Sequence, residues 1–369
     1  MIASIVATLL TVQAATAERL GGWGDETMEM IRRDFYLPDK MLYAEDFTPG
    51  TPSRQPAFNW GVGVMLSALN AAARYDDKYK PSLDEFATAS HIYWNETGPV
   101  PGYDVLPSPK PVDRYYDDNA WMVMQLIETY DLLKKEKYLA WAKETLKFVL
   151  SGEDTKIGGG IYWKETDKGG KATCSSGPAA AACLAVYRHT KDSRYLVDAI
   201  RIYEWTKQKL QDPDDFLFWD AISLEGRVDT SKWSYNTALM IRAAADLHAY
   251  TKNGSYVRDL VRMQSSSAKR WLGESLKDEG RFAHLLMDAW LYQRYRLPVK
   301  NPKQAESDQA AFTGPLTWLH ENGRSEDGYY GKRFDAPPKP DQKKFALLDQ
   351  ASAARAYFSA ANYFRKKDQ

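Results

Sequence analysis

The chain has 369 residues, which is long enough for one large domain or two ordinary ones. Lys plus Arg and Asp plus Glu both number 49, so no excess of charge favours nucleic acid or an acidic membrane surface as a partner. Aromatic residues are numerous, with 12 Trp and 23 Tyr. Such rings form flat platforms in sugar-binding sites, although large helical cores also use them.

Residues 2–17 form an apolar run that ends in Ala15-Thr16-Ala17, an Ala-x-Ala cleavage pattern. The run is too short to span a membrane, and it lacks the positively charged start of a typical signal peptide. No Cys follows it that could carry a lipid anchor. We predict a signal peptide over residues 1–17, a catalytic domain over residues 18–369, and a secreted or periplasmic protein.

Beyond this run the apolar residues recur with the period of a helix, and no long segment alternates as a strand does. The spacing predicts twelve helices, at residues 23–36, 58–75, 82–94, 118–133, 136–150, 176–190, 193–210, 234–251, 254–273, 280–296, 302–322 and 345–366.

The predicted helices come in pairs whose two members differ in composition. One member is rich in small and apolar residues, as at 179–185 and 238–245, and the other carries charge on one face, as at 192–209. A helix that is apolar all round is buried, whereas an amphipathic helix faces solvent. The pattern predicts an all-α fold, an (α/α)6 toroid of six helical hairpins. An open α-solenoid is the alternative, but no repeat of 33–47 residues is visible.

The two cysteines, Cys174 and Cys183, are nine residues apart. Cys183 lies within a predicted helix, and Cys174 lies just before it. They would lie about 13 Å apart, which is too far for a disulfide. We expect free thiols.

Two adjacent acids, Asp117 and Asp118, stand at the start of the helix predicted at 118–133, inside the segment YYDDNAW. A single Asp at such a place is ordinarily an N-cap. Consecutive residues diverge by roughly 100° around a helix, so we expect one to cap it and the other to point into whatever lies at that end. Paired carboxyl groups beside aromatic rings are what glycoside hydrolysis needs, and we predict that Asp117 and Asp118 are catalytic.

In a toroid the inner helices all begin at one end of the barrel, so the turns that lead into them are neighbours in space. Polar and aromatic residues gather in these turns, and we expect an aromatic-lined cleft with acids at its base. Individual Ser and Asn residues would also serve as caps, but loops have no structural need for several tryptophans. The predicted substrate-binding residues are Asn59, Trp60, Tyr116, Asn119, Trp163, Glu165, Ser175, Ser176, Trp219, Asp220, Tyr235 and Asn236.

Other charged residues fit a site less well. Asp76 and Asp77 follow a helix at its far end, and the acids at 212–215 surround a Pro in a turn, where we expect them to be solvated. No His/Cys cluster has metal-ligand spacing and no calcium-loop pattern occurs, so we expect neither a metal nor a cofactor. His284 is the histidine at the site end, and we expect it to be structural.

Five segments resemble glycoside hydrolase family 76, the endo-α-1,6-mannanases. They are YYDDNAW at 115–121, GGGIYW at 158–163, SSGP at 175–178, FWD at 218–220 and WSYN at 233–236. The resemblance implies an (α/α)6 fold and retaining cleavage of α-1,6-linked mannan backbones. It also implies that Asp117 is the nucleophile and Asp118 the acid/base, an order that the residues themselves leave open. We expect a monomer that acts on α-mannan polysaccharide or oligosaccharide.

Spacing also bears on the stereochemistry. Retaining enzymes place their carboxyl groups about 5–5.5 Å apart and inverting enzymes roughly 6.5–9.5 Å. Consecutive Cα atoms are only about 3.8 Å apart, which favours the retaining arrangement. A more distant acid, Asp220 or Glu165, could still partner one Asp in an inverting geometry.

Other functions are compatible with parts of the pattern. A cell-wall mannan transglycosylase, a polysaccharide lyase, a glucuronyl hydrolase and a sugar epimerase would share the toroid. A lyase needs cations to neutralise a uronate and an epimerase needs a pair of histidines, and the predicted site is poor in both. A glycan-binding protein without activity would have no use for two adjacent, partly desolvated acids.

Overall fold

The computed structural model describes residues 2–51, 55–107, 112–297 and 302–365. In the first range side chains are described from residue 13 onward, and in the last range from residue 308 onward. Twelve α-helices are found in these ranges. They are α1 (Ile2–Asp34), α2 (Asn59–Tyr75), α3 (Lys80–Ala89), α4 (Tyr116–Leu133), α5 (Glu136–Ser151), α6 (Thr173–Thr190), α7 (Ser193–Leu210), α8 (Ser234–Thr251), α9 (Gly254–Trp271), α10 (Gly280–Arg296), α11 (Pro302–Asn322) and α12 (Leu347–Arg365).

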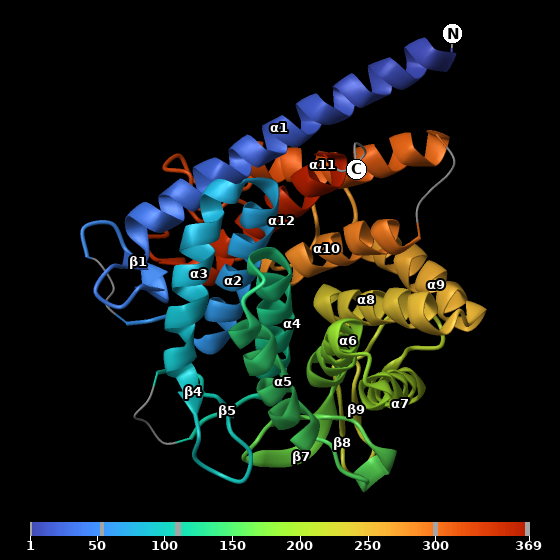
Figure 1. Cartoon of the computed structure of the whole chain (residues 1–369). Coiled ribbons are helices and arrows are strands. Elements are labelled where there is room, and N and C mark those ends of the chain that lie inside the picture. The colour runs from blue at the N-terminus through green and yellow to red at the C-terminus, as the bar shows by residue number, and fades with distance from the viewer. Residues whose placement is uncertain (1, 52–54, 108–111, 298–301, 366–369) are drawn as a thin grey trace.

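The even-numbered helices form a closed inner ring (Figure 1). Each packs against the next in the order α2, α4, α6, α8, α10 and α12, and α12 packs against α2. The helices α5, α7 and α9 pack on the outside of α4, α6 and α8, and α1 packs along α12. The fold is therefore the predicted (α/α)6 toroid, and closure between α12 and α2 excludes an open solenoid.

Small residues let the inner helices approach one another closely. A Cβ atom on Gly177 of α6 would lie 3.1 Å from the Cβ of Leu239 on α8. One on Gly63 of α2 would lie 3.5 Å from the Cβ of Trp121 on α4. Nearly every residue of α12 from 347 to 362 is buried, as expected for a helix surrounded by neighbours.

The first predicted helix, at 23–36, is too short. Helix α1 already begins at Ile2, because the apolar run at 2–17 continues it without a break. Gln13, Thr16 and Ala17 are buried, so the end of the run packs against the rest of the protein. Among the described residues, none of the helices combines the length and the apolar character that a membrane span needs.

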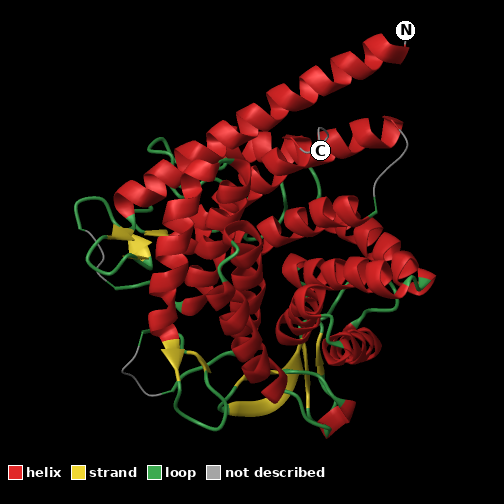
Figure 2. Cartoon of the chain, viewed as in Figure 1, coloured by secondary structure: helices red, strands yellow, loops and turns green. Residues whose placement is uncertain are grey.

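Short strands lie outside the helical ring (Figure 2). Three two-stranded antiparallel sheets pair β1 (Tyr36–Leu37) with β2 (Leu42–Tyr43), β3 (Asp46–Phe47) with β10 (Phe345–Ala346), and β4 (Trp94–Asn95) with β5 (Gly102–Tyr103). A four-stranded antiparallel sheet has the order β6 (Tyr162–Lys164), β7 (Asp167–Ala172), β8 (Ala221–Ser223) and β9 (Val228–Asp229). We predicted loops here, because the polar, glycine-containing sequence of β7 has no apolar alternation.

The four-stranded sheet matters for the site because it is continuous with the helices. Strand β7 ends at Ala172 and α6 begins at Thr173. The Thr173 amide donates to the carbonyl of Asp220, which directly precedes β8. The sheet thus fixes two of the turns at the end of the ring where the inner helices begin, which we call the N-terminal end of the ring.

Candidate active site

Both acids of the predicted pair lie in the first turn of α4, after Tyr115. We expected one of them to cap this helix, and that expectation is wrong. Tyr115 occupies the N-cap position with an extended backbone, and it makes no side-chain cap hydrogen bond. An antiparallel bridge between Tyr115 and Lys164 accounts for this, because it holds Tyr115 extended and starts the helix one residue before Asp117.

The Asp117 side chain is partly exposed, and its two oxygen atoms have different surroundings. Its Oδ2 accepts a hydrogen bond of 3.0 Å from the indole Nε1 of Trp163. Its Oδ1 is buried and has no hydrogen-bond partner among the described residues. The indole of Trp163 thus fixes the orientation of the Asp117 carboxyl group.

The two carboxyl groups differ in acidity. Burial raises the pKa of Asp117 to about 6, although hydrogen bonds to its carboxylate oppose the increase. Burial also raises the pKa of Asp118 well above its usual range, and the negative charges of Asp117 and Asp113 raise it further. The N-terminus of α4 favours a negative charge in its first turn. Asp117 is therefore the more readily ionised of the two carboxyl groups.

Asp117 has further polar neighbours, from the starts of α6 and α8. The Cys174 thiol and the Asp117 carboxyl group form a hydrogen bond, and the thiol also interacts with the Tyr235 hydroxyl. Burial raises the pKa of Cys174, and the charges of Asp117 and Asp220 add to the increase. The side-chain amide of Asn236 donates a 3.0 Å hydrogen bond to Asp220. Three of these neighbours, Tyr235, Asp220 and Asn236, were predicted for the site.

Cys174 contacts Asp117 but was not among the predicted site residues. The prediction named its neighbours Ser175 and Ser176, which are both fully buried. The Ser176 hydroxyl accepts a hydrogen bond of 3.0 Å from the amide of Ile161, so it holds the preceding loop. The position of these three consecutive residues at a helix start places all of them near Asp117. Which of the three reaches Asp117 depends on how α6 is rotated about its axis.

Aromatic rings gather at the same end of the ring. Trp163 is 48% exposed and makes an edge contact with Tyr115, with ring centroids 4.9 Å apart. Phe282 of α10 stacks between Tyr235 and Trp60, at centroid distances of 4.5 Å and 5.8 Å. Phe282 was not among the predicted site residues.

Two more charged residues, not predicted for the site, lie beside this stack. The Arg281 guanidinium is 5.5 Å from the centroid of Trp60, and it lies 3.6 Å from Asp349 in the first turn of α12. Burial raises the pKa of Asp349 to about 6, and Arg281 opposes the increase. The N-terminal end of the ring therefore carries a second acid besides the pair on α4.

Two predicted substrate residues, Tyr116 and Asn119, have a structural place instead. Tyr116 is 2% exposed and stacks on Phe148 at 4.9 Å. Asn119 is fully buried, and its side chain hydrogen-bonds the backbone of Tyr103 and Tyr115. These contacts lock the first turn of α4 but leave Tyr116 and Asn119 no surface for a sugar.

Glu165 is committed to Arg114, which is itself buried. The pair is bidentate, with distances of 2.8 Å and 2.9 Å. This leaves Glu165 ill placed to act as a distant second acid.

The remaining predicted residues differ in their burial and in their hydrogen-bond partners. Trp219 is partly buried and hydrogen-bonds Asp212, in the loop after α7. Asn59 is buried at the start of α2, and its side-chain atoms have no hydrogen-bond partner among the described residues. His284 is buried with its Nδ1 2.9 Å from the carbonyl oxygen of Gly280. Cys174 and Cys183 are both free, as predicted.

The acids that the sequence analysis excluded from the site lie away from the Asp117–Asp118 pair or are bound to other residues. Asp76 is the C-cap of α2, at the far end of the ring. Asp212 and Asp215 are not simply solvated, as we had expected, because the Lys232 ammonium pairs with both, at 2.5 Å and 2.8 Å. Within the described ranges, no group of three or more His, Cys, Asp or Glu side chains could hold a metal ion.

Comparisons with known proteins agree with this geometry. The sequence model of glycosyl hydrolase family 76 matches residues 32–319. A solved family 76 α-mannanase of Bacteroides thetaiotaomicron is 30% identical, with a TM-score of 0.87 over 95% of this chain and 97% of that chain. No curated protein matches the sequence.

Two more distant structures share the fold. One is an α-1,6-mannanase of a Salegentibacter species, an inactive variant with two consecutive aspartates replaced by asparagine, in complex with α-1,6-mannotriose. It is 22% identical, with a TM-score of 0.78 over 95% of this chain and 99% of that chain. Dfg5 from Chaetomium thermophilum, in complex with glucosamine, is 15% identical, with a TM-score of 0.74 over 94% of this chain and 90% of that chain.

The raised pKa of Asp117 predicts a pH-dependent change in stability. The folded chain binds this proton more tightly than the unfolded chain, so the group's contribution to stability is complete below pH 3.8 and is lost as the pH rises through about 6. We expect Asp117→Asn to increase the free energy of unfolding at about pH 8 by about 1–3 kcal/mol. Each pKa unit is worth roughly 1.4 kcal/mol, and the partial exposure of the side chain lowers the total.

Urea denaturation followed by circular dichroism measures the change. The gain should shrink towards zero at about pH 3.5. Asp327→Asn, at an exposed position, is the matched control and should change stability little at either pH. A gain that is equal at both pH values would contradict the assignment.

Proposed function

Because the chain belongs to glycosyl hydrolase family 76, we propose that it is a retaining glycosidase that cleaves α-1,6-mannosidic linkages in mannan backbones. The observation that carries the proposal is the pair of consecutive carboxyl groups with unequal acidity at the start of α4. The 30% identical relative is an α-mannanase, and the more distant α-1,6-mannanase was made inactive by replacing two consecutive aspartates. Both facts support the substrate and the site.

The first step uses both acids. The Asp117 carboxylate attacks the anomeric carbon, and the bond from that carbon to the leaving oxygen breaks. Asp118 gives its proton to the leaving oxygen. The product of this step is a glycosyl ester of Asp117 with inverted configuration.

The second step reverses the roles. Asp118, now ionised, takes a proton from a water molecule that attacks the same carbon. The ester bond breaks, Asp117 is released as a carboxylate, and the sugar regains its original configuration. The raised pKa of Asp118 keeps it protonated for the first step, and the hydrogen bond from Trp163 keeps Asp117 oriented in both.

Single substitutions of the two acids test this function. Asp117→Asn and Asp118→Asn should each lower the hydrolysis of linear α-1,6-mannan by at least about 100-fold, because each removes an acid or a nucleophile that the chemistry requires. Release of reducing ends measures the rate, and far-UV circular dichroism verifies the fold. Asp327→Asn should keep the wild-type rate.

The linkage is tested with the same assay. Oligosaccharides of α-1,2- or α-1,3-linked mannose and a β-1,4-mannan should remain intact. Near-wild-type turnover by both acid variants would show that the site lies elsewhere, and equal cleavage of the other linkages would refute the proposed specificity.

Export remains a second proposal, and it rests on the apolar run before Ala17. Cleavage after Ala17 would remove Gln13, Thr16 and Ala17, which are buried, so the mature helix would begin at Glu18. The mass of the chain recovered from the medium or periplasm of an expressing bacterium should match residues 18–369. A full-length chain retained in the cytoplasm would contradict this proposal.

A further inference from the structure

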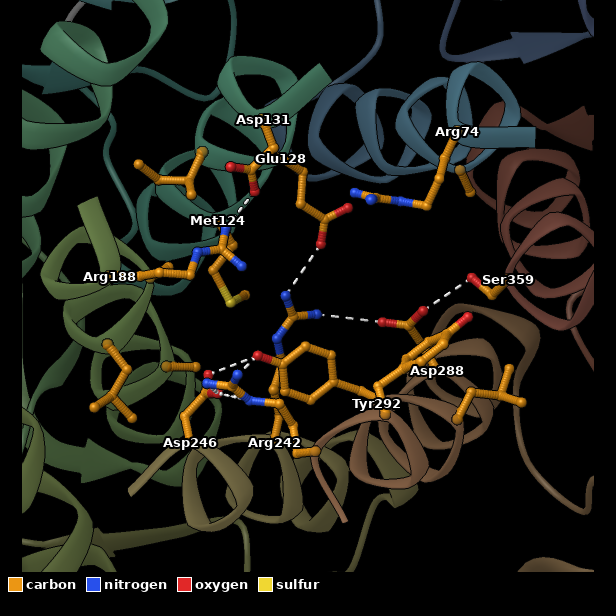
Figure 3. Close-up of a pocket in the computed structure, with 18 of the residues that line it drawn as sticks. Arg74, Met124, Glu128, Asp131, Arg188, Arg242, Asp246, Asp288, Tyr292 and Ser359 are labelled. Carbon is orange, nitrogen blue, oxygen red and sulfur yellow. Dashed lines mark hydrogen bonds and ion pairs between the residues drawn. The ribbon is translucent and has the colours of Figure 1, made fainter. Parts of the chain in front are cut away.

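A cavity of about 450 Å³ lies at the opposite end of the ring, where the inner helices end (Figure 3). Its volume lies within the range of small-molecule sites, roughly 300–1,000 Å³. All six inner helices contribute lining residues, and none of the residues predicted for the active site is among them. Glu128, which lines the cavity, follows Asp118 by ten residues on α4, so the two are about 15 Å apart along the helix.

Four charged residues of the cavity form a neutral network. Glu128 accepts hydrogen bonds from Arg242 and Arg355, at 3.0 Å and 2.9 Å. Asp288 lies 2.9 Å from Arg355 and 3.3 Å from Arg242. Each carboxylate thus has two guanidinium partners, and each guanidinium has two carboxylates, as burial of charge requires.

Ion pairs also join neighbouring inner helices near their C-terminal ends. Asp131 of α4 pairs with Arg188 of α6. Asp246 of α8 accepts a 2.6 Å hydrogen bond from the Nε of Arg296 on α10. By the same pattern, a third pair would join α12 to α2.

That third pair is incomplete. Arg74 of α2 forms no hydrogen bond or ion pair with any residue in the described ranges, although its positive charge acts on Glu128. On α12 the cavity is lined by Asn362, whose amide Nδ2 donates to the carbonyl of Ala71. Figure 3 shows Arg74 pointing into the cavity towards Glu128, which already binds two arginines.

The cavity therefore has one guanidinium more than it has carboxylates. Its arginines are Arg74, Arg188, Arg242, Arg296 and Arg355, and its acids are Glu128, Asp131, Asp246 and Asp288. The C-terminal ends of six helices favour cations here, which helps to explain the arginines. Arg74 is exposed, so its guanidinium donors face solvent and are available to an anion that enters the cavity.

We propose that this cavity binds a small organic acid of about monosaccharide size, with its carboxylate on Arg74. A guanidinium group presents a planar fork that matches a carboxylate in a bidentate arrangement. The volume exceeds the needs of a bare ion, and the rest of the lining offers the ring of Tyr292 and the apolar side chains of Met124 and Leu291 to the body of a ligand. A uronic acid has this chemistry. The site would be separate from the active site and would bind without turnover.

Calorimetric titration of D-glucuronate into the full chain tests the proposal, with methyl glucoside as the neutral probe and inorganic phosphate as the bare anion. Glucuronate should bind, and methyl glucoside should not. Arg74→Met should weaken glucuronate binding by at least about tenfold, because hydrogen bonds to charged groups are worth roughly 1.5–3 kcal/mol. Arg258→Met, which removes an exposed arginine from the outer helix α9, should leave the affinity unchanged.

A second variant supplies the missing acid. Asn362→Asp would place a carboxylate on α12 beside Arg74 and should weaken glucuronate binding by a similar factor. Arg74 is exposed, so its variant should fold even if the buried Asn362 variant does not. No binding of glucuronate, equal binding by the Arg74→Met chain, equal binding of methyl glucoside, or binding of phosphate alone would each overturn the proposal.

Discussion

Two carboxyl groups on consecutive residues share a largely enclosed space at the start of α4, and the surroundings allow only one of them to ionise readily. Burial disfavours both charges, and a charge on Asp117 makes a second on Asp118 still less favourable. The helix N-terminus, the indole of Trp163 and the thiol of Cys174 all favour the charge on Asp117. Burial, charge and these contacts thus give the two carboxyl groups different acidity.

The closed ring makes this arrangement possible, because it brings the starts of six helices together. The segment between α5 and α6 contributes most to the site. It places Trp163 on one oxygen of Asp117, holds Tyr115 extended through Lys164, and leads into the first turn of α6, which contains Cys174. Behind the pair, Asn119 fixes the first turn of α4 to Tyr103. The opposite end of the ring is filled with charge instead, and its cavity is chemically unlike the aromatic active-site end.

Helix positions and the acid pair were predictable because periodicity and the YYDDNAW segment are local signals. The side chains that reach the acids were harder to predict, since the direction of a residue at a helix start depends on how the helix is rotated in the ring. Tyr116 and Asn119 therefore pack inward although they adjoin the acids, and Cys174 reaches Asp117 where the two serines beside it do not. The sheet of β6–β9 was not predicted, because β7 has no apolar alternation and its pairing with β8 joins segments about 50 residues apart.

The central claim is that Asp117 forms a covalent bond to the sugar and that Asp118 serves it as acid and base. The anomeric form of the first product tests this claim most directly. Proton NMR of an α-1,6-mannan digest, recorded before mutarotation, should show the α-anomer at the new reducing end. Initial release of the β-anomer would mean that water attacks the sugar directly, and the account of the acid pair would be wrong.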